Sequence, residues 1–252
     1  MPTIDLNADV GESFGRWQLG DDAAIFESVT SANIACGFHA GDPSTIAATC
    51  RAAVAAGIAI GAHVAYRDLA GFGRRFLDCS RTEMTDDVLY QLGALDACAR
   101  AAGGRIAYVK PHGALYHAMV DHDDHAAAVI DAMVAFNRDL PILALPGARV
   151  LAHADQHGIR GVAEAFADRA YNADGTLVSR RKPHAMITDN TAIIANMRYL
   201  AEHGEIVAHD GTRVAVAAES ICVHGDSPDA VATAQALRQA LAEAGIGLKA
   251  FA

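Results

Sequence analysis

The sequence has few cysteines, and their spacing does not match a disulfide framework or a zinc ribbon. Five cysteines are spread along 252 residues, and no pair has the CxxC spacing. An odd number of separated cysteines is not typical of a disulfide-stapled domain, and zinc ribbons need close pairs. A chain of this length also buries enough surface to fold without such links. We therefore expect it to fold without disulfides or a structural metal.

Positive charge is also scarce. Lysine and arginine number 20 against 30 acidic residues, which gives a formal net charge of −10 at pH 7. Nucleic acids and anionic membranes repel such a surface, so neither is expected as a partner. The longest apolar stretch, Ala52 to Ala62, is too short to span a bilayer. The first residues, MPTIDLNADVGE, have acids where a signal peptide has lysines, so we expect a cytoplasmic location.

Common motifs of nucleotide and zinc enzymes are absent as well. The sequence has no GxxxxGK[ST] phosphate loop, no GxGxxG after a strand and no HExxH. These motifs hold phosphates on backbone N–H groups or place two histidines on one helix face. If the reaction uses ATP, this chain does not hold it in a Walker site.

What is present is a regular alternation of short β-rich runs and alanine-rich helical segments. Hydrophobic residues make up 52% of the chain, which excludes a disordered protein. The predicted strands are Thr3–Val10, Ser31–Gly37, Ala59–Ala65, Ile106–His112, Pro141–Pro146, Gly161–Ala167 and Arg213–Val223. Such alternation predicts an α/β fold with a parallel sheet covered by helices. We predict a single-domain (β/α) barrel over residues 1–252 with about seven parallel strands. An open doubly wound sheet is the alternative.

Capping residues mark several helix boundaries. An N-cap, a capping box or a serine–proline pair opens a helix, and a glycine closes it. The expected helices run from Asp42-Pro43 to Gly57, from the Ser80 and Glu83 capping box to Gly103-Gly104, and from Ser227-Pro228 to Gly245.

The first predicted strand is unusually polar on one face. Asp5, Asn7 and Asp9 alternate with apolar residues, so their side chains point the same way. A buried parallel strand is normally apolar on both faces. This pattern therefore indicates a polar barrel interior, or else an edge strand that faces water.

Polar residues also follow the other predicted strands, where parallel α/β folds place their active sites. The candidates are His39, His63, Lys110, His112, Glu164 and His224. A lysine on a buried strand is costly unless it is paired, so we expect Lys110 to meet Asp5, Asp9 or Glu164. Cation, carboxylate and imidazole together are the groups of general acid–base catalysis.

Two further features lie near these strand ends. Arg74 and Arg75 stand in the glycine-flanked segment GFGRR, which suggests a site for a carboxylate or phosphate, although an ordinary surface ion pair is the alternative. Cys36 and Cys222 lie near strand ends too, but inert buried cysteine is commoner than a nucleophile.

The longest of these segments resemble the LamB/YcsF family. The matching segments are IDLNADVGES at 4–13, TSANIACGFHAGDP at 30–43, GAH at 61–63, GFGRR at 71–75, VKPHGALY at 109–116, EAFADRAYNADGTLVSR at 164–180 and ICVHGD at 221–226. They cover nearly the whole chain in the family's order. The resemblance implies a seven-stranded (β/α) barrel related to the glycoside hydrolase/deacetylase barrels. The chain departs from the family pattern at Val64, Ala65, Arg67 and Ser179, which bears on the shape of two loops.

The resemblance implies a role as the A subunit of an ATP-dependent 5-oxoprolinase. That enzyme cleaves 5-oxo-L-proline to L-glutamate with hydrolysis of ATP, and its B and C subunits are the expected partners. 5-Oxoproline and ATP would then be the ligands of the complex, with ATP as co-substrate.

Within this hypothesis the candidate catalytic residues are Asp9, Lys110, His112 and Glu164, and the candidate substrate-binding residues are Asn7, His39, His63, Arg74, Arg75 and His224. Two other functions stay open. A metal-dependent amide hydrolase or deacetylase would use Asp9, His39, His63 and His112 as ligands of a divalent metal. A non-catalytic subunit would bind the lactam and pass it to its partners.

Overall fold

Seven parallel strands close into a barrel in the computed structural model, which describes residues 2–180, 182–223 and 230–252. The strands are β1 (Thr3–Val10), β2 (Ser31–Ala35), β3 (Ala59–His63), β4 (Ile106–Val109), β5 (Ile142–Ala144), β6 (Gly161–Phe166) and β9 (Ser220–Val223). Each pairs with the next, and β9 pairs with both β6 and β1, which closes the ring. The predicted barrel is therefore confirmed, and an open sheet is excluded.

The residues of β1 show why the barrel has a polar interior. Leu6 and Ala8 are fully buried in the apolar cluster between strands and helices. Asp5 and Asn7, on the opposite face of the strand, are 1% and 0% exposed. Both faces are thus shielded from water, and the water-facing edge strand is excluded.

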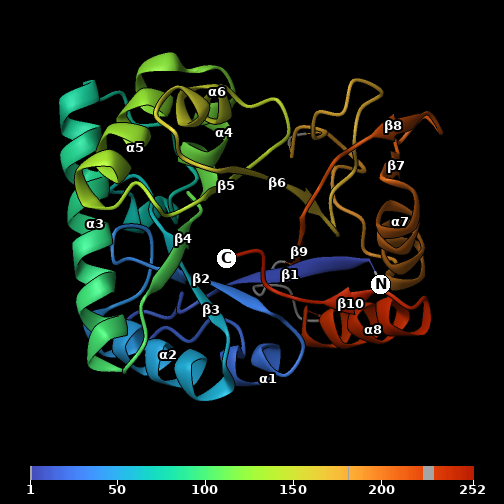
Figure 1. Ribbon diagram of the computed structural model, residues 1–252, viewed down its shortest axis with the longest axis horizontal. Coiled ribbons are helices and arrows are strands. Elements are labelled where there is room, and N and C mark those ends of the chain that lie inside the picture. The colour runs from blue at the N-terminus through green and yellow to red at the C-terminus, as the bar shows by residue number, and fades with distance from the viewer. Residues whose placement is uncertain (1, 181, 224–229) are drawn as a thin grey trace.

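Helices surround the barrel on its outside (Figure 1). They are α1 (Asp22–Phe26), α2 (Pro43–Ala56), α3 (Arg81–Ala101), α4 (Gly113–Asp121), α5 (Asp123–Phe136), α6 (Arg149–Gln156), α7 (Asn190–His203) and α8 (Ala230–Glu243), with a short 3-10 turn, η1, at Leu69–Gly71. None of the helices in the described ranges is long and apolar enough to cross a membrane.

The predicted helix caps are found where the described residues allow a comparison. The Asp42 side chain accepts from the N–H groups of Ser44 and Thr45, and Gly57 ends α2 in the left-handed conformation. Ser80 and Glu83 form the reciprocal capping box of α3. The predicted start of the last helix, Ser227-Pro228, lies outside the described residues.

One predicted strand was wrong. The run Arg213–Val223 is not continuous, because it divides into β8 (Arg213–Ala215) and β9. β8 pairs antiparallel with β7 (Glu205–Val207) in a separate hairpin, and a turn in which the Ala218 N–H donates to the Val216 carbonyl breaks the run. Only the second part of the run belongs to the barrel.

The C-terminal segment covers the end of the barrel where the strands begin. Here β10 (Gly247–Leu248) pairs with the first residues of β1. Beyond it, the Phe251 ring lies 4.9 Å from the Tyr108 ring, centroid to centroid, and Arg160 donates to the Phe251 carbonyl. Tyr108 itself is buried inside the barrel and donates to Asn33 Oδ1 at 2.6 Å.

The close packing of Tyr108 gives a test of the barrel interior. A Cβ atom added to Gly61 would lie 2.2 Å from Cζ of Tyr108, whereas one added to Gly93 on α3 would meet nothing within 4 Å. We expect Gly61→Ala to lower the free energy of unfolding by about 1–3 kcal/mol, because the added methyl group would overpack the core. Gly93→Ala, the matched control, should raise it by roughly 0.5–1 kcal/mol through helix propensity.

Chemical denaturation of both variants measures these changes. Equal stabilities for Gly61→Ala and Gly93→Ala would show that Tyr108 does not occupy the barrel interior.

Candidate functional site

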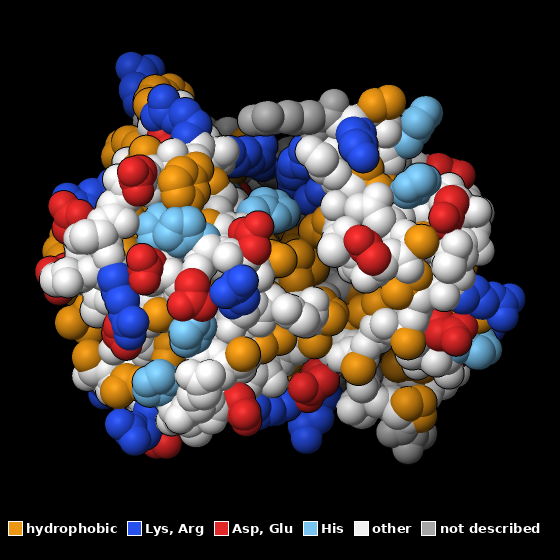
Figure 2. Space-filling view, turned by 90° about the horizontal axis from the view of Figure 1, so that it is seen from above, with side chains coloured by type: hydrophobic (Ala, Val, Ile, Leu, Met, Phe, Trp, Pro, Cys, Tyr) orange, Lys and Arg blue, Asp and Glu red, His pale blue; other side chains and the backbone are white. Residues whose placement is uncertain are grey.

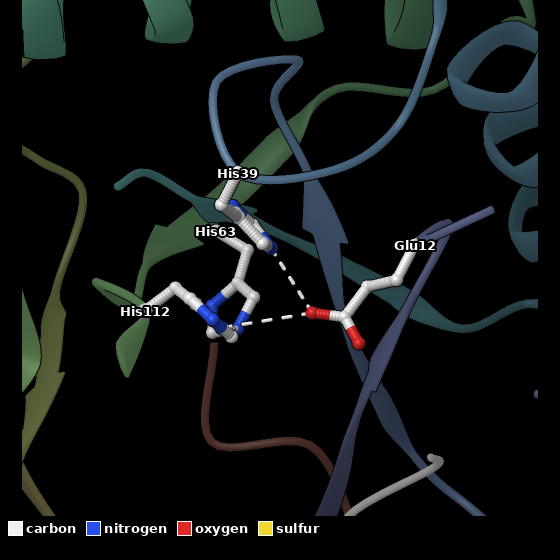
Figure 3. A group of neighbouring side chains, drawn as sticks. All are labelled: Glu12, His39, His63 and His112. Carbon is white, nitrogen blue, oxygen red and sulfur yellow. Dashed lines mark hydrogen bonds and ion pairs between the residues drawn. The ribbon is translucent and has the colours of Figure 1, made fainter. Parts of the chain in front are cut away.

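Four consecutive strands bring a glutamate and three histidines together at their carboxyl ends. Glu12 follows β1, His39 follows β2, His63 ends β3 and His112 follows β4. One ligand atom from each lies within 4.8 Å of all the others, and all four residues are buried. Figure 3 shows the imidazole rings and the carboxylate pointing toward one another.

Backbone carbonyls fix the orientation of two of the rings. His63 Nδ1 lies 2.8 Å from the Lys110 carbonyl oxygen, and His112 Nε2 lies 2.9 Å from that of Phe72. Because a carbonyl oxygen only accepts, each of these ring nitrogens must donate a proton. In a neutral ring the remaining nitrogen then has a lone pair, and these two nitrogens face each other across 2.9 Å.

Carboxylate oxygens add further negative charge around these two lone pairs. Asp9 Oδ1 is 3.3 Å from His63 Nε2, and Glu12 Oε1 is 3.6 Å from His112 Nδ1 and 3.0 Å from His39 Nε2. Acceptors this close together repel one another unless a positive group lies between them. Either an extra proton or a cation would remove the repulsion.

Burial disfavours the extra proton. It is the main cause of the lowered pKa of both His39 and His112, and the neighbouring histidines lower these pKa values further. Three imidazoles and a carboxylate fit Zn²⁺ or a similar divalent ion, and backbone acceptors behind the rings are the usual support of such ligands. Glu12, His39, His63 and His112 therefore fit a divalent metal.

A glycine loop closes over this cluster. Gly73 packs so closely that an added Cβ would lie 2.8 Å from His39 Cβ and from His112 Cδ2. The preceding Phe72 has a positive φ of 55°, and its ring meets both imidazoles edge to face. The segment GFGRR therefore shields the cluster, whereas the sequence had indicated an anion site or a surface ion pair there.

The two arginines of this loop have different surroundings. The Arg75 guanidinium pairs with buried Asp68, and its side chain is 64% exposed. Arg74 lies over the Phe72 ring, 5.0 Å from its centroid, and lines the cavity above the cluster. Arg75 thus forms the surface ion pair that the sequence offered as an alternative to an anion site. Arg74 lies at the cavity and remains a candidate site residue.

Lys110 lies beside the cluster in the polar interior. Its Nζ is 3.0 Å from Glu164 Oε2, 3.0 Å from Asn7 Oδ1 and 3.5 Å from Asp9 Oδ1, and it donates to Cys222 Sγ at 3.1 Å. Burial on its own lowers the pKa of Lys110, but Asp9, Cys222 and Glu164 outweigh it and hold that pKa well above the ordinary value. The predicted carboxylate partners are thus found, except Asp5.

Asp5 instead is held by hydroxyl groups deeper in the barrel. Thr30 and Ser31 each donate to Asp5 Oδ1 at 2.6 Å, and Ser220 donates to Oδ2. Burial raises the pKa of Asp5 despite these hydrogen bonds.

Burial also raises the pKa values of the Cys222 and Cys36 thiols. A thiol that keeps its proton is a poor nucleophile, so both cysteines are better explained as inert buried residues.

A cavity of about 800 Å³ opens above these groups. Asp9, Glu12, His63, Lys110 and His112 form part of its wall. Other parts come from α4, from the end of β6 and from the loop after it, including Tyr116, Phe166, Arg169 and residues 174–180. In Figure 2, basic and histidine side chains gather around the central hollow of the molecule.

Most predicted site residues meet at this cavity or directly below it. Asn7, Asp9, His39, His63, Lys110, His112 and Glu164 form one connected set of contacts. His224 lies outside the described residues. Sequence reasoning missed Glu12, although it follows the first strand just as the histidines follow theirs.

Comparison with known proteins agrees with the resemblance noted in the sequence. The family model of the LamB/YcsF family matches residues 4–252. The chain belongs to the LamB/YcsF family. It is 61% identical to the 5-oxoprolinase A subunit of Kocuria rhizophila and 53% identical to that of Streptomyces coelicolor. The match covers 100% of both chains in the first case, and 99% of this chain and 100% of the relative in the second.

Solved structures share the same architecture. A lactam utilization protein from Thermus thermophilus is 44% identical, with a TM-score of 0.95 over 99% of this chain and 100% of that one. A cellobiose-phosphate cleavage protein from Enterococcus faecalis, described as putative, has a TM-score of 0.55 at 12% identity, over 98% of this chain and 96% of that one. At that identity the second likeness concerns the fold alone.

The geometry of the histidine cluster predicts metal binding. Chain purified without chelator and dialysed against Zn²⁺ should retain about one equivalent, as measured by elemental analysis. Glu12→Gln keeps the side-chain volume but removes a charged ligand, so its affinity for Zn²⁺ should fall at least about tenfold. His153→Asn, on α6 and outside the cluster, should bind as the wild type does. Failure of the wild-type chain to retain Zn²⁺ would instead assign the extra positive charge to a proton.

Proposed function

We propose that this chain is the A subunit of an ATP-dependent 5-oxoprolinase, acting with the B and C subunits to convert 5-oxo-L-proline into L-glutamate. Full-length identity to proteins named as 5-oxoprolinase subunits supports the activity. That these relatives are subunits supports a complex. The expected cytoplasmic location would give the complex access to ATP.

The observation that carries the proposal is the charged lysine beside the histidine cluster in a cavity. A lactam is an amide and a poor electrophile, so ring opening needs a group that stabilises negative charge on the carbonyl oxygen. Lys110 is held in place by Asn7, Asp9 and Glu164 before any ligand binds. Such a fixed cation costs no reorganisation during the reaction.

The proposed steps use residues at the cavity wall and Glu164, which is buried beside Lys110. ATP phosphorylates the lactam oxygen, which activates the ring carbon, and a first water adds to that carbon. The C–N bond then breaks to leave an acyl phosphate, and a second water hydrolyses this acyl phosphate to glutamate and phosphate. Lys110 stabilises the developing charge on oxygen, and Asp9 or Glu164 accepts the proton from water. When no metal ion is bound, the proton shared between His63 Nε2 and His112 Nδ1 is the one that the ring nitrogen takes when the C–N bond breaks. A divalent ion at Glu12 and the three histidines would supply Lewis-acid polarisation of an oxygen when bound.

The ATP site is assigned to the complex rather than to this chain. The sequence has no Walker phosphate loop. The cavity wall has acidic groups, Asp9 and Glu12, among its basic side chains, so it is not a uniformly positive surface for a triphosphate. Arg74 remains the proposed contact for an anionic group of the ligand.

A second function is favoured by the histidine cluster itself. Three imidazoles and a carboxylate around one point are the equipment of a metal-dependent amide hydrolase, which would open the lactam without ATP. The two functions differ in whether phosphate and glutamate are released together.

Purified alone, this chain should release little or no glutamate from 5-oxoproline and ATP. With the B and C subunits, glutamate and phosphate should appear in equal amounts, because one ATP is hydrolysed for each ring opened. Glutamate and phosphate are measured in parallel, for the chain alone and for the complex. Glutamate release by the metal-loaded chain alone, without ATP, would favour the amide hydrolase instead.

Lys110→Met tests the role of the buried cation. If the charge stabilises the transition state, glutamate formation by the complex should fall roughly 100-fold or more, since a preorganised charge contributes ~3 kcal/mol. We expect only a modest fall of the thermal midpoint, whereas a purely structural lysine would cost about 3–5 kcal/mol of stability. Lys249→Met, next to β10 at the far end of the barrel, is the control.

Turnover and thermal midpoint must be measured on the same preparation of Lys110→Met. A folded variant that keeps more than about a tenth of the wild-type turnover would make Lys110 part of the scaffold.

A further inference from the structure

Two buried polar groups on the cavity wall have no hydrogen-bond partner among the described residues. They are the Tyr116 hydroxyl and Nε of Arg169. The exposed fractions of these residues are 4% and 3%, so ordinary bulk solvent does not compensate them. Buried polar atoms in native proteins are nearly always paired, so an unpaired one calls for an explanation, such as a water molecule, an ion or a ligand atom that completes the contact.

Arg169 is a buried cation without an ion pair in the described part of the chain. Its guanidinium donates from Nη2 to the Val178 carbonyl at 2.8 Å, which leaves Nε unsatisfied. Burial is the main cause that lowers its pKa to about 10, and the repulsion of Arg180 lowers it further. Arg169 therefore stays charged at neutral pH.

Tyr116 supplies a neutral donor. Burial is the main cause that raises the pKa of its hydroxyl well above the ordinary value, and the nearby charge of Glu164 raises it further. The phenol therefore keeps its proton at neutral pH. Glu164 is the neighbouring acceptor: its side chain interacts with the Tyr116 hydroxyl, although neither that O–H nor Glu164 Oε1 has a partner in good hydrogen-bond geometry among the residues described. A ligand oxygen that accepts from Tyr116 would replace this weak contact.

Tyr116 and Lys110 lie close to the same aromatic ring. The Tyr116 ring meets the Phe166 ring edge to face, with centroids 5.6 Å apart, and Lys110 Nζ lies 5.3 Å from the Phe166 centroid. Arg169 is close enough to Tyr116 for the two to interact electrostatically. The unpaired donors are thus within reach of a small molecule whose other end contacts Lys110.

We propose that Tyr116 and Arg169 bind the carboxylate of the lactam substrate. This inference rests on the proposed function, because it takes 5-oxoproline as the ligand. The guanidinium and the phenol O–H donate to the carboxylate oxygens, while the lactam carbonyl lies toward Lys110 and the ring packs on Phe166. Tyr116 and Arg169 would then select for a lactam that carries an acid group.

A carboxylate fits this pair better than a phosphoryl group. One buried guanidinium and one neutral hydroxyl match a single negative charge, whereas a phosphate carries up to two. Arginine binds a planar carboxylate with two parallel hydrogen bonds, which accounts for a donor left unpaired on the guanidinium.

The test compares two ligands that differ only in the carboxylate, 5-oxoproline and 2-pyrrolidinone. Titration calorimetry without ATP, on the full chain alone and with the B and C subunits, gives both affinities. Wild type should prefer 5-oxoproline at least about tenfold, the size of one hydrogen bond to a charged group. Tyr116→Phe and Arg169→Lys should each weaken 5-oxoproline binding about tenfold or more and leave 2-pyrrolidinone binding unchanged.

Tyr116→Phe is the cleaner variant, because it keeps the ring and removes only a hydroxyl whose contact with Glu164 lacks good hydrogen-bond geometry, so the thermal midpoint should change little. Tyr90→Phe, an exposed tyrosine on α3, is the matched control and should bind both ligands as wild type does.

Four outcomes would overturn the assignment, and the last of them concerns the proposed function as well. The carboxylate site is refuted if wild type binds the two ligands equally, or if both variants bind 5-oxoproline as wild type does. Neither result contradicts the proposed lactam activity. Weaker competition by inorganic phosphate in the variants, with 5-oxoproline binding unchanged, reassigns the pair to phosphate. If neither lactam binds the wild type in the complex, the proposed function itself fails.

Discussion

The buried charge of Lys110 is the constraint that determines which groups line the barrel interior. A buried ammonium group is tolerated only when carboxylates and hydrogen-bond acceptors replace its lost water. Asn7, Asp9 and Glu164 do this from two different strands, so the closed ring of strands is what brings them together. The same carboxylate, Asp9, also contacts His63, which couples the lysine to the histidine cluster.

Much of this arrangement follows from local features of the sequence. The alternation of Asp5, Asn7 and Asp9 with apolar residues predicted a polar interior because side chains on a strand alternate faces. Histidines after consecutive strands had to meet once those strands were parallel and adjacent. A helix cap such as Asp42 depends only on neighbouring residues, so its position could also be predicted from the local sequence.

Other features depend on contacts between segments that are distant in the sequence, so they could not be predicted from local sequence patterns. Glu12 was passed over because a glutamate in a loop is ordinary until three histidines surround it. The run Arg213–Val223 has a composition typical of a strand throughout. Its first part, however, pairs with β7 in a separate hairpin and is not part of the barrel. Arg169 and Tyr116 are notable only because their polar atoms are unpaired in the described part of the folded chain.

The C-terminal segment has a consequence for the opposite end of the molecule. With Phe251 lying over Tyr108, the strand-start end of the barrel is sealed, and Tyr108 in turn bonds to Asn33, which donates to Asn7 and Asp9. Water admitted beneath Phe251 would raise the local dielectric constant and weaken charge interactions throughout the interior. A substitution in the last few residues can thereby alter the electrostatics around Lys110 without touching the cavity.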